Sequence, residues 1–166
     1  MAPTVFQILS AFVLAAAAVA SVKAESHTIK FDNRYIYTSP TLIVNGANQT
    51  LANNQWTVTG SSASGIAYLQ TGECLYNGEH CTLLETTLGN SHCEGCGSST
   101  DISLIPPYVL TCASSCVFLR SYYNGCDGEG ATCDTPDCST AFFKSDDNQV
   151  QVACQSDDVN LLITFC

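Results

Sequence analysis

The sequence predicts an all-β domain of the sandwich type, and three observations lead to that prediction. Short runs rich in β-branched and aromatic residues recur along the chain, and clusters of Gly, Asn, Ser and Pro separate them, as turns separate strands. Beyond the first 24 residues, no window carries apolar residues at helical spacing together with helix caps. The chain holds 11 cysteines, a density typical of loops held by disulfides.

The first predicted strands alternate in polarity or end at turn signals. Residues 27–31 (HTIKF) alternate between polar and apolar side chains. Residues 40–44 (PTLIV) lead into the turn Asn45-Gly46, and residues 55–59 (QWTVT) begin after a pair of asparagines. The remaining strands are expected at residues 66–71, 82–88, 102–105, 117–123, 149–154 and 159–165. Nine strands in one domain favour a sandwich.

Proline and disulfides shape the second half of the chain. Pro106-Pro107 ends the strand at 102–105, because proline offers no N–H to a strand ladder. Residues 126–138 (CDGEGATCDTPDC) are too rich in Gly, Asp and Thr to bury a core of their own. We therefore expect disulfides to hold this segment.

The first residues predict a signal peptide. Residues 5–20 (VFQILSAFVLAAAAVA) form an uncharged apolar run, and the small-x-small site VKA precedes residue 25; cleavage after Ala20 is the alternative. The run is shorter than the roughly 20 residues that a bilayer-spanning helix needs, so we interpret residues 1–24 as a signal peptide rather than a membrane anchor. Residues 25–166 then form a single domain, secreted and either extracellular or associated with a cell wall.

The expected mature part is strongly acidic. Its fifteen acidic residues face the four basic ones that remain once Lys23 is removed, for a formal charge of about −11. Such a surface repels phosphate backbones and anionic lipids, so no nucleic-acid or membrane partner is expected. Neutral or cationic partners remain, namely glycans, cell-wall polymers, basic proteins or calcium.

In an exported chain, the cysteines predict a disulfide framework. Cys93, Cys96, Cys112 and Cys116 lie in two close pairs that are similar to zinc ligands, but an oxidising compartment favours disulfides there. The odd count leaves at least one thiol without an intramolecular partner. The one N-glycosylation sequon begins at Asn48, between turn-rich segments where a surface site is expected.

Several kinds of chemistry have no motif in the chain. A nucleophile elbow, a phosphate-binding glycine loop and a dinucleotide fingerprint are all missing, so neither triad hydrolysis nor nucleotide chemistry is expected. Four acids between residues 126 and 138 could offer oxygen ligands to calcium, but their spacing fails the EF-hand pattern, and solvated loop charge is the preferred interpretation. We therefore expect no cofactor and no metal site. These acids are Asp127, Glu129, Asp134 and Asp137.

Glu85 and Asp101 are a further acidic pair. Glu85 lies inside an apolar, Thr-rich strand, and Asp101 begins the strand DISLI. Two carboxylates across a cleft can act as acid and base on a glycosidic bond, or can bind sugar hydroxyls without any chemistry. From spacing alone, two unrelated surface acids are the simpler interpretation.

Several motifs, in order, resemble the thaumatin-like protein family. LANNQWTVTG resembles its L-x-x-G-x-x-W segment, IAYLQTGEC its W-x-R-T-x-C segment, TLLETTL its T-L-A-E-F-x-L segment and DISLIPPYVL its D-I/V-S-L-V segment. The chain also closes on T-F-C, and IAYLQTG, STDISLIPP and YYNGCDG are similar to a small fungal branch of secreted proteins labelled glycopeptides. The resemblance covers most of the expected mature chain and implies a thaumatin-like β-sandwich with disulfide-stapled loops.

The resemblance also assigns roles to single residues. It implies that Glu85 and Asp101 contribute to an acidic cleft, which in larger members is associated with binding or weakly cleaving β-1,3-glucans. Gln70 stands where the family has an arginine. Tyr35 stands where the family has the cysteine that bonds the final one, so Cys166 becomes the expected free thiol. The implied disulfides join Cys74 with Cys81, Cys126 with Cys154, Cys133 with Cys138, and Cys93, Cys96, Cys112 and Cys116 among themselves.

The leading hypothesis is a secreted, non-catalytic protein that binds glycans or cell-wall polysaccharide of the β-1,3-glucan type. Glycan contacts are assigned to Glu85, Asp101, Gln70, Tyr122 and Tyr123, with the two tyrosines as exposed stacking rings. One alternative is a weak glycoside hydrolase in which Glu85 and Asp101 are catalytic. The other is an effector or defence factor directed at proteins of another organism, because secretion and cysteine density fit that role equally well.

Overall fold

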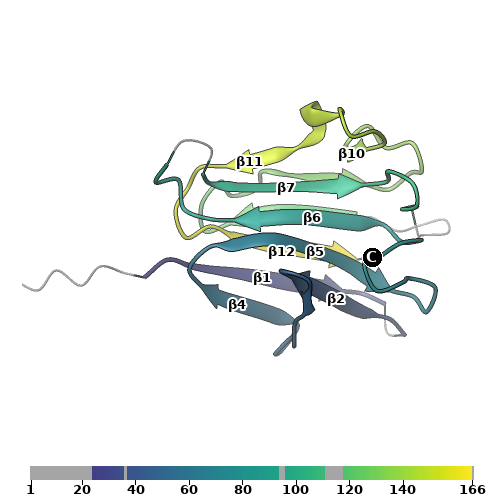
Figure 1. The fold of residues 1–166 in the computed structure, drawn as a ribbon, viewed down its shortest axis with the longest axis horizontal. Helices are drawn as coiled ribbons and strands as arrows, with labels where there is room; N and C mark the ends of the chain where they lie inside the picture. Colours follow the sequence, from purple (N-terminus) through teal and green to yellow (C-terminus); the bar gives the residue numbers. More distant parts are fainter. Residues whose placement is uncertain (1–23, 36, 94–95, 111–117, 166) are drawn as a thin grey trace, which may run out of the picture.

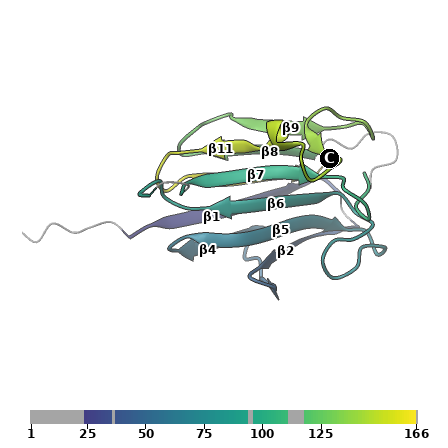
Figure 2. The ribbon, with the colours of Figure 1, turned by 45° about the horizontal axis from the view of Figure 1, so that its top comes forward.

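The computed structural model describes residues 24–35, 37–93, 96–110 and 118–165, and within them two β-sheets pack face to face (Figures 1 and 2). The predicted all-β sandwich is confirmed. The expected signal peptide lies outside these ranges, apart from its last residue. The strands are β1 (Ser26–Asn33), β2 (Ser39–Val44), β3 (Ala47–Asn48), β4 (Gln55–Thr59), β5 (Ser62–Gln70), β6 (Leu83–Leu88), β7 (Ser98–Ser103), β8 (Phe118–Tyr123), β9 (Gly130–Cys133), β10 (Ala141–Phe142), β11 (Val152–Cys154) and β12 (Asn160–Phe165).

The two sheets differ in size and composition. The five-stranded sheet has the order β4-β1-β12-β8-β9, and the seven-stranded sheet has the order β10-β7-β6-β5-β2-β3, with β11 also paired to β7. Pairing is antiparallel except between β1 and β12 and between β10 and β7. No helix of the described residues has the length and apolar character needed to cross a bilayer.

Three predicted strands have clearly different bounds in the structure, and β3, β9 and β10 were not predicted. The strand expected at 66–71 is β5, which begins four residues earlier, at Ser62. The strand expected at 102–105 is β7, which begins at Ser98 and ends at Ser103, ahead of Pro106-Pro107. The strand expected at 149–154 is reduced to β11, because the residues before it form a 3-10 helix, η1 (Asn148–Val150). Local backbone hydrogen bonds in η1 take the place of a strand ladder there.

The first and last strands lie side by side in the five-stranded sheet. β1 and β12 are parallel, with Ile29 beside Leu161, and the Arg34 N–H donates to the Phe165 carbonyl (2.9 Å). The rings of Phe31 and Phe165 stack with their centroids 6.1 Å apart. Backbone pairing and ring packing therefore join the two ends of the domain. Cys166, the expected free thiol, lies outside the described residues.

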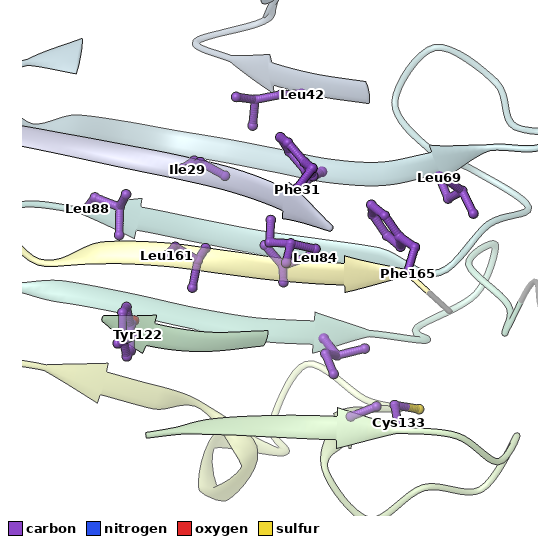
Figure 3. Packing of buried hydrophobic residues seen from close by; sticks show 14 of the residues in the cluster. Ile29, Phe31, Leu42, Leu69, Leu84, Leu88, Tyr122, Cys133, Leu161 and Phe165 are labelled. Atoms are coloured by element: carbon purple, nitrogen blue, oxygen red, sulfur yellow. The ribbon is translucent and has the colours of Figure 1, made fainter. Parts of the chain in front are cut away.

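The main core lies between the two sheets (Figure 3). Alternate residues of each strand point inward, and Ile29, Leu42, Leu84 and Leu161 are fully buried there. Each such side chain contributes about 1.5–3 kcal/mol of stabilisation by leaving water. Both sheets supply this layer, so neither sheet buries its inner face without the other.

Tyr122 belongs to this core, and its predicted role as an exposed stacking ring is wrong. Its side chain is 1% exposed, because β12 aligns it with the inward-facing Leu161. Its hydroxyl donates to the Val152 carbonyl (3.1 Å) and lies 2.8 Å from the Thr100 hydroxyl. Thr100 in turn lies 3.0 Å from the Thr86 hydroxyl, so a chain of buried hydroxyls crosses between the sheets.

Four disulfides occur within the described ranges. Three are the pairs drawn from the family resemblance, and the fourth closes the loop between β6 and β7. The protein is therefore a cysteine-rich, disulfide-bonded all-β protein. Cys112 and Cys116 lie outside the described residues. The observed bonds join Cys74 to Cys81, Cys126 to Cys154, Cys133 to Cys138 and Cys93 to Cys96.

Candidate functional site: an acidic hollow

Glu85 and Asp101 meet on the outer face of the seven-stranded sheet. Along β6, Leu84 and Leu88 point into the core, so the strand alternation turns Glu85 outward. Along β7, Ile102 points into the core and Asp101 outward. The two strands are antiparallel with Glu85 directly opposite Asp101, a position in which Cβ atoms lie about 5 Å apart. The fold thus brings together two acids that lie in separate motifs of the sequence.

A hollow of about 320 Å³ opens over this pair. Besides the two acids, the polar side chains of Ser64, Thr87, Ser99 and Gln151 line it. Gln151 reaches the hollow because β11, which it precedes, pairs with β7. Within the described residues, no hydrogen bond or ion pair occupies the Glu85 carboxylate. The lining therefore offers a ligand several hydroxyls, an amide and carboxylate oxygens.

The same face is closed at its other end by a disulfide-bonded loop. Tyr68 and Leu83 form a second buried cluster with the Cys74–Cys81 disulfide. The Tyr68 hydroxyl donates to the Tyr76 carbonyl (2.9 Å) and so ties the loop to the sheet. One half of the outer face is therefore covered, and the half that carries the acids is open.

Tyr108 is a candidate binding residue that sequence reasoning missed. Its half-buried ring packs against the second cluster, just after Pro106-Pro107. Burial raises the pKa of Tyr108, and the negative charges of Glu79 and Glu85 raise it further. The Tyr108 ring therefore lies within electrostatic reach of Glu85, although it does not line the acidic hollow. The available signal was an aromatic residue directly after the proline pair that ends a strand.

The other predicted contact residues lie elsewhere. Gln70 holds a turn: its amide donates to the Cys74 carbonyl (3.1 Å), and its oxygen accepts from the Gly72 N–H (2.8 Å). Tyr123 lies on the outer face of the five-stranded sheet, where the Lys30 ammonium stands 5.0 Å from its ring centre. Neither residue lines the acidic hollow. Of the predicted contact residues, only the two acids lie together.

A second carboxylate, that of Glu25, has a different environment: Glu25 directly precedes β1, and its carboxylate reaches the loop after β6. It accepts hydrogen bonds from the Asn90 N–H (2.8 Å) and from the ring of His27 (3.0 Å). His27 is fully buried, and its other ring nitrogen lies 2.7 Å from the Val159 carbonyl. The hydrogen bond from His27, followed by that from Asn90, lowers the pKa of Glu25. We call Glu25, His27 and Asn90 the terminal clasp.

Comparison with known proteins adds no relative. No protein-family model, no curated protein and no solved structure matches this chain. Within the described ranges, no group of three or more His, Cys, Asp or Glu side chains is arranged to hold a metal ion. The resemblance to thaumatin-like proteins stays a prediction, and the function is argued from the acidic hollow itself.

Proposed function

We propose that the protein is secreted and binds neutral glycans, such as β-1,3-glucan of a cell wall, in the acidic hollow without cleaving them. One observation carries the proposal: Glu85 and Asp101 stand side by side in an open, polar hollow. Carboxylates accept hydrogen bonds from sugar hydroxyls, and the hydroxyl and amide side chains of the lining can form further hydrogen bonds with them. The motif order described above supports the same class of ligand.

The charge of the domain supports a neutral ligand. Acidic residues far outnumber basic ones, so the protein repels anionic polymers before contact. The hollow itself adds two carboxylates to this field. A neutral polysaccharide meets no such barrier, and its hydroxyls can donate to the Glu85 carboxylate in the hollow.

Binding is the simpler use of the acid pair. Hydrolysis requires two carboxyl groups that flank a scissile bond, with one of them protonated as a general acid. Binding requires only hydrogen-bonding groups, which the two acids and the hydroxyl and amide side chains of the hollow supply. The proposal is therefore binding, and an assay for released sugar distinguishes it from hydrolysis.

Retention on insoluble β-1,3-glucan tests the proposal. Glu85→Gln keeps the side-chain shape and removes the charge, and we expect about a tenfold loss of affinity, equivalent to roughly 1.4 kcal/mol. Glu129→Gln is the matched control. Glu129 is exposed beside the five-stranded sheet, and its substitution changes the net charge by the same amount as Glu85→Gln. Equal retention of the two variants, or no retention of the wild type, would overturn the proposal.

Two further measurements separate the alternatives. Release of reducing sugar from laminarin by the wild type, abolished by Glu85→Gln, would replace binding with hydrolysis. A glycan array without any signal, combined with cell death on infiltration of a host tissue, would replace it with a protein-directed effector. We expect neither result.

A further inference from the structure

A row of directly paired residues crosses the outer face of the seven-stranded sheet. Asn48 pairs with Ile43, Ile43 with Ile66, Ile66 with Glu85, and Glu85 with Asp101. Directly paired residues point to the same side of a sheet, so Asn48 shares the outer face with the acid pair. Three strand spacings separate Asn48 from Glu85, which amounts to about 14 Å. The N-glycosylation sequon and the acidic hollow therefore lie in register on one face.

The fold presents Asn48 as an acceptor. It ends β3, a two-residue strand at the free edge of the sheet, and its side chain is exposed. The preceding turn, Asn45-Gly46, has φ values of 51° and 76°, the two-residue turn of a tight hairpin that glycine permits at low cost. Within the described residues, no hydrogen bond occupies the Asn48 amide, and Thr50 of the sequon is also exposed.

An exposed aromatic ring lies next to this acceptor. The Tyr76 hydroxyl donates to the Gly46 carbonyl (3.1 Å), two residues before Asn48. Tyr76 remains 57% exposed. A sugar attached to Asn48 therefore begins beside an aromatic surface on the face that holds the hollow.

We propose that Asn48 carries an N-linked glycan, and that this glycan screens the acidic hollow: it weakens the binding of long polysaccharides there several-fold without abolishing it, while short oligosaccharides enter freely. The donor is a polyprenyl-diphosphate-linked oligosaccharide. The Asn48 amide nitrogen forms a bond to the anomeric carbon of the first sugar, the bond from that carbon to the diphosphate oxygen breaks, and the nitrogen loses one proton as the lipid diphosphate departs. The modification rests on passage through a secretory pathway, and the screening rests on the proposed glycan binding.

Mass spectrometry of the full chain, secreted from a yeast host, tests the modification. The variants form a matched set, because Thr50→Ala destroys the sequon and Thr50→Ser preserves it, and neither alters Asn48. We expect glycan mass on the wild type and on Thr50→Ser, and none on Thr50→Ala. Enzymatic release of the glycan converts a modified asparagine to aspartate, so peptide mapping identifies the site. Unmodified Asn48 in the secreted wild type would overturn the proposal.

Binding by the same three proteins tests the screening. We expect several-fold stronger retention of Thr50→Ala on insoluble β-1,3-glucan than of the wild type and Thr50→Ser, with equal affinities of all three for short soluble β-1,3-oligosaccharides. Equal retention of the three proteins would overturn the screening. Failure of all three to bind either ligand would overturn the proposed function and the screening with it. Mass spectrometry tests the glycosylation of Asn48 whatever the outcome of the binding measurements.

Discussion

Two carboxylate regions close to β6 are used in opposite ways. In the terminal clasp, Glu25 accepts hydrogen bonds from Asn90 and His27. In the acidic hollow, Glu85 stands beside another acid and faces an open space. Thr87 lines both the hollow and the space beside the clasp. The comparison indicates that the role of a carboxylate depends on the hydrogen-bond donors around it. A carboxylate with donors nearby stabilises the fold, and one without them is available to a ligand.

The clasp joins three segments that are far apart in the sequence. The Asp158 N–H donates to the Asn90 side chain (2.7 Å), and the Ser26 N–H donates to the Asp158 carboxylate (3.1 Å). With Glu25 and His27, these bonds tie the start of β1 to the loop after β6 and to the turn before β12. The carboxylates of Glu25 and Asp158 accept hydrogen bonds within the protein, whereas the Glu85 carboxylate faces the hollow.

The largest expected effect is a loss of stability when the terminal clasp is disrupted. His27→Ala removes a fully buried ring and leaves the Val159 carbonyl and the Glu25 carboxylate without this donor. We expect the free energy of unfolding to fall by about 3 kcal/mol, measured by chemical denaturation. His92→Ala is the control, because its exposed ring stands 3.7 Å from Asp157 and contributes little. Equal losses in the two variants would show that His27 has no special role.

A smaller effect is expected on the pH dependence of stability. The lowered pKa of Glu25 contributes stability above its ordinary value of 4.5, and this contribution is lost as the pH falls below that value. Glu25→Gln therefore flattens the acid side of the stability profile and costs about 1 kcal/mol at neutral pH. Denaturation at a series of pH values measures both changes. Glu129→Gln should retain the wild-type profile; a profile unchanged by Glu25→Gln would contradict the role of the clasp.

The smallest expected effect is a gain in stability when one of the paired acids in the hollow is neutralised. Glu85 lies directly opposite Asp101, and like charges in that position destabilise a sheet. We expect Glu85→Gln to raise the free energy of unfolding by about 0.5 kcal/mol at neutral pH, and added salt to reduce the gain. The same variant loses affinity for glycan, so it separates stability from binding. Destabilisation as large as that of Glu25→Gln would mean that Glu85 is a structural residue and would end the contrast between the two regions.

Strand positions were largely predictable because alternation is local. The pattern at residues 27–31 placed a strand inside β1, and QWTVT coincides with β4. The Asn45-Gly46 turn was predicted from its residue types and joins β2 to β3. Boundaries failed where short-range backbone bonds competed, as in η1, which takes up residues 149 and 150 of the strand expected at 149–154.

The site was predictable only in part. Motif similarity singled out Glu85 and Asp101, and the fold places them together. The assignment of Tyr122 as an exposed ring failed because neighbouring residues of a strand point to opposite faces, and nothing local to Tyr122 and Tyr123 states which face is the core. Tyr108 was missed because its position depends on a loop folding back over the sheet.

The sequence by itself determined the class of the molecule: alternating strands, proline and glycine boundaries, a cysteine-rich chain and an acidic surface. These are properties of composition and of neighbouring residues. Only the tertiary structure decided the row from Asn48 to Asp101, the burial of Tyr122 and the clasp around Glu25. The physical reason is that strand pairing joins residues far apart in the chain, and its register is set by burying one face of each sheet against the other.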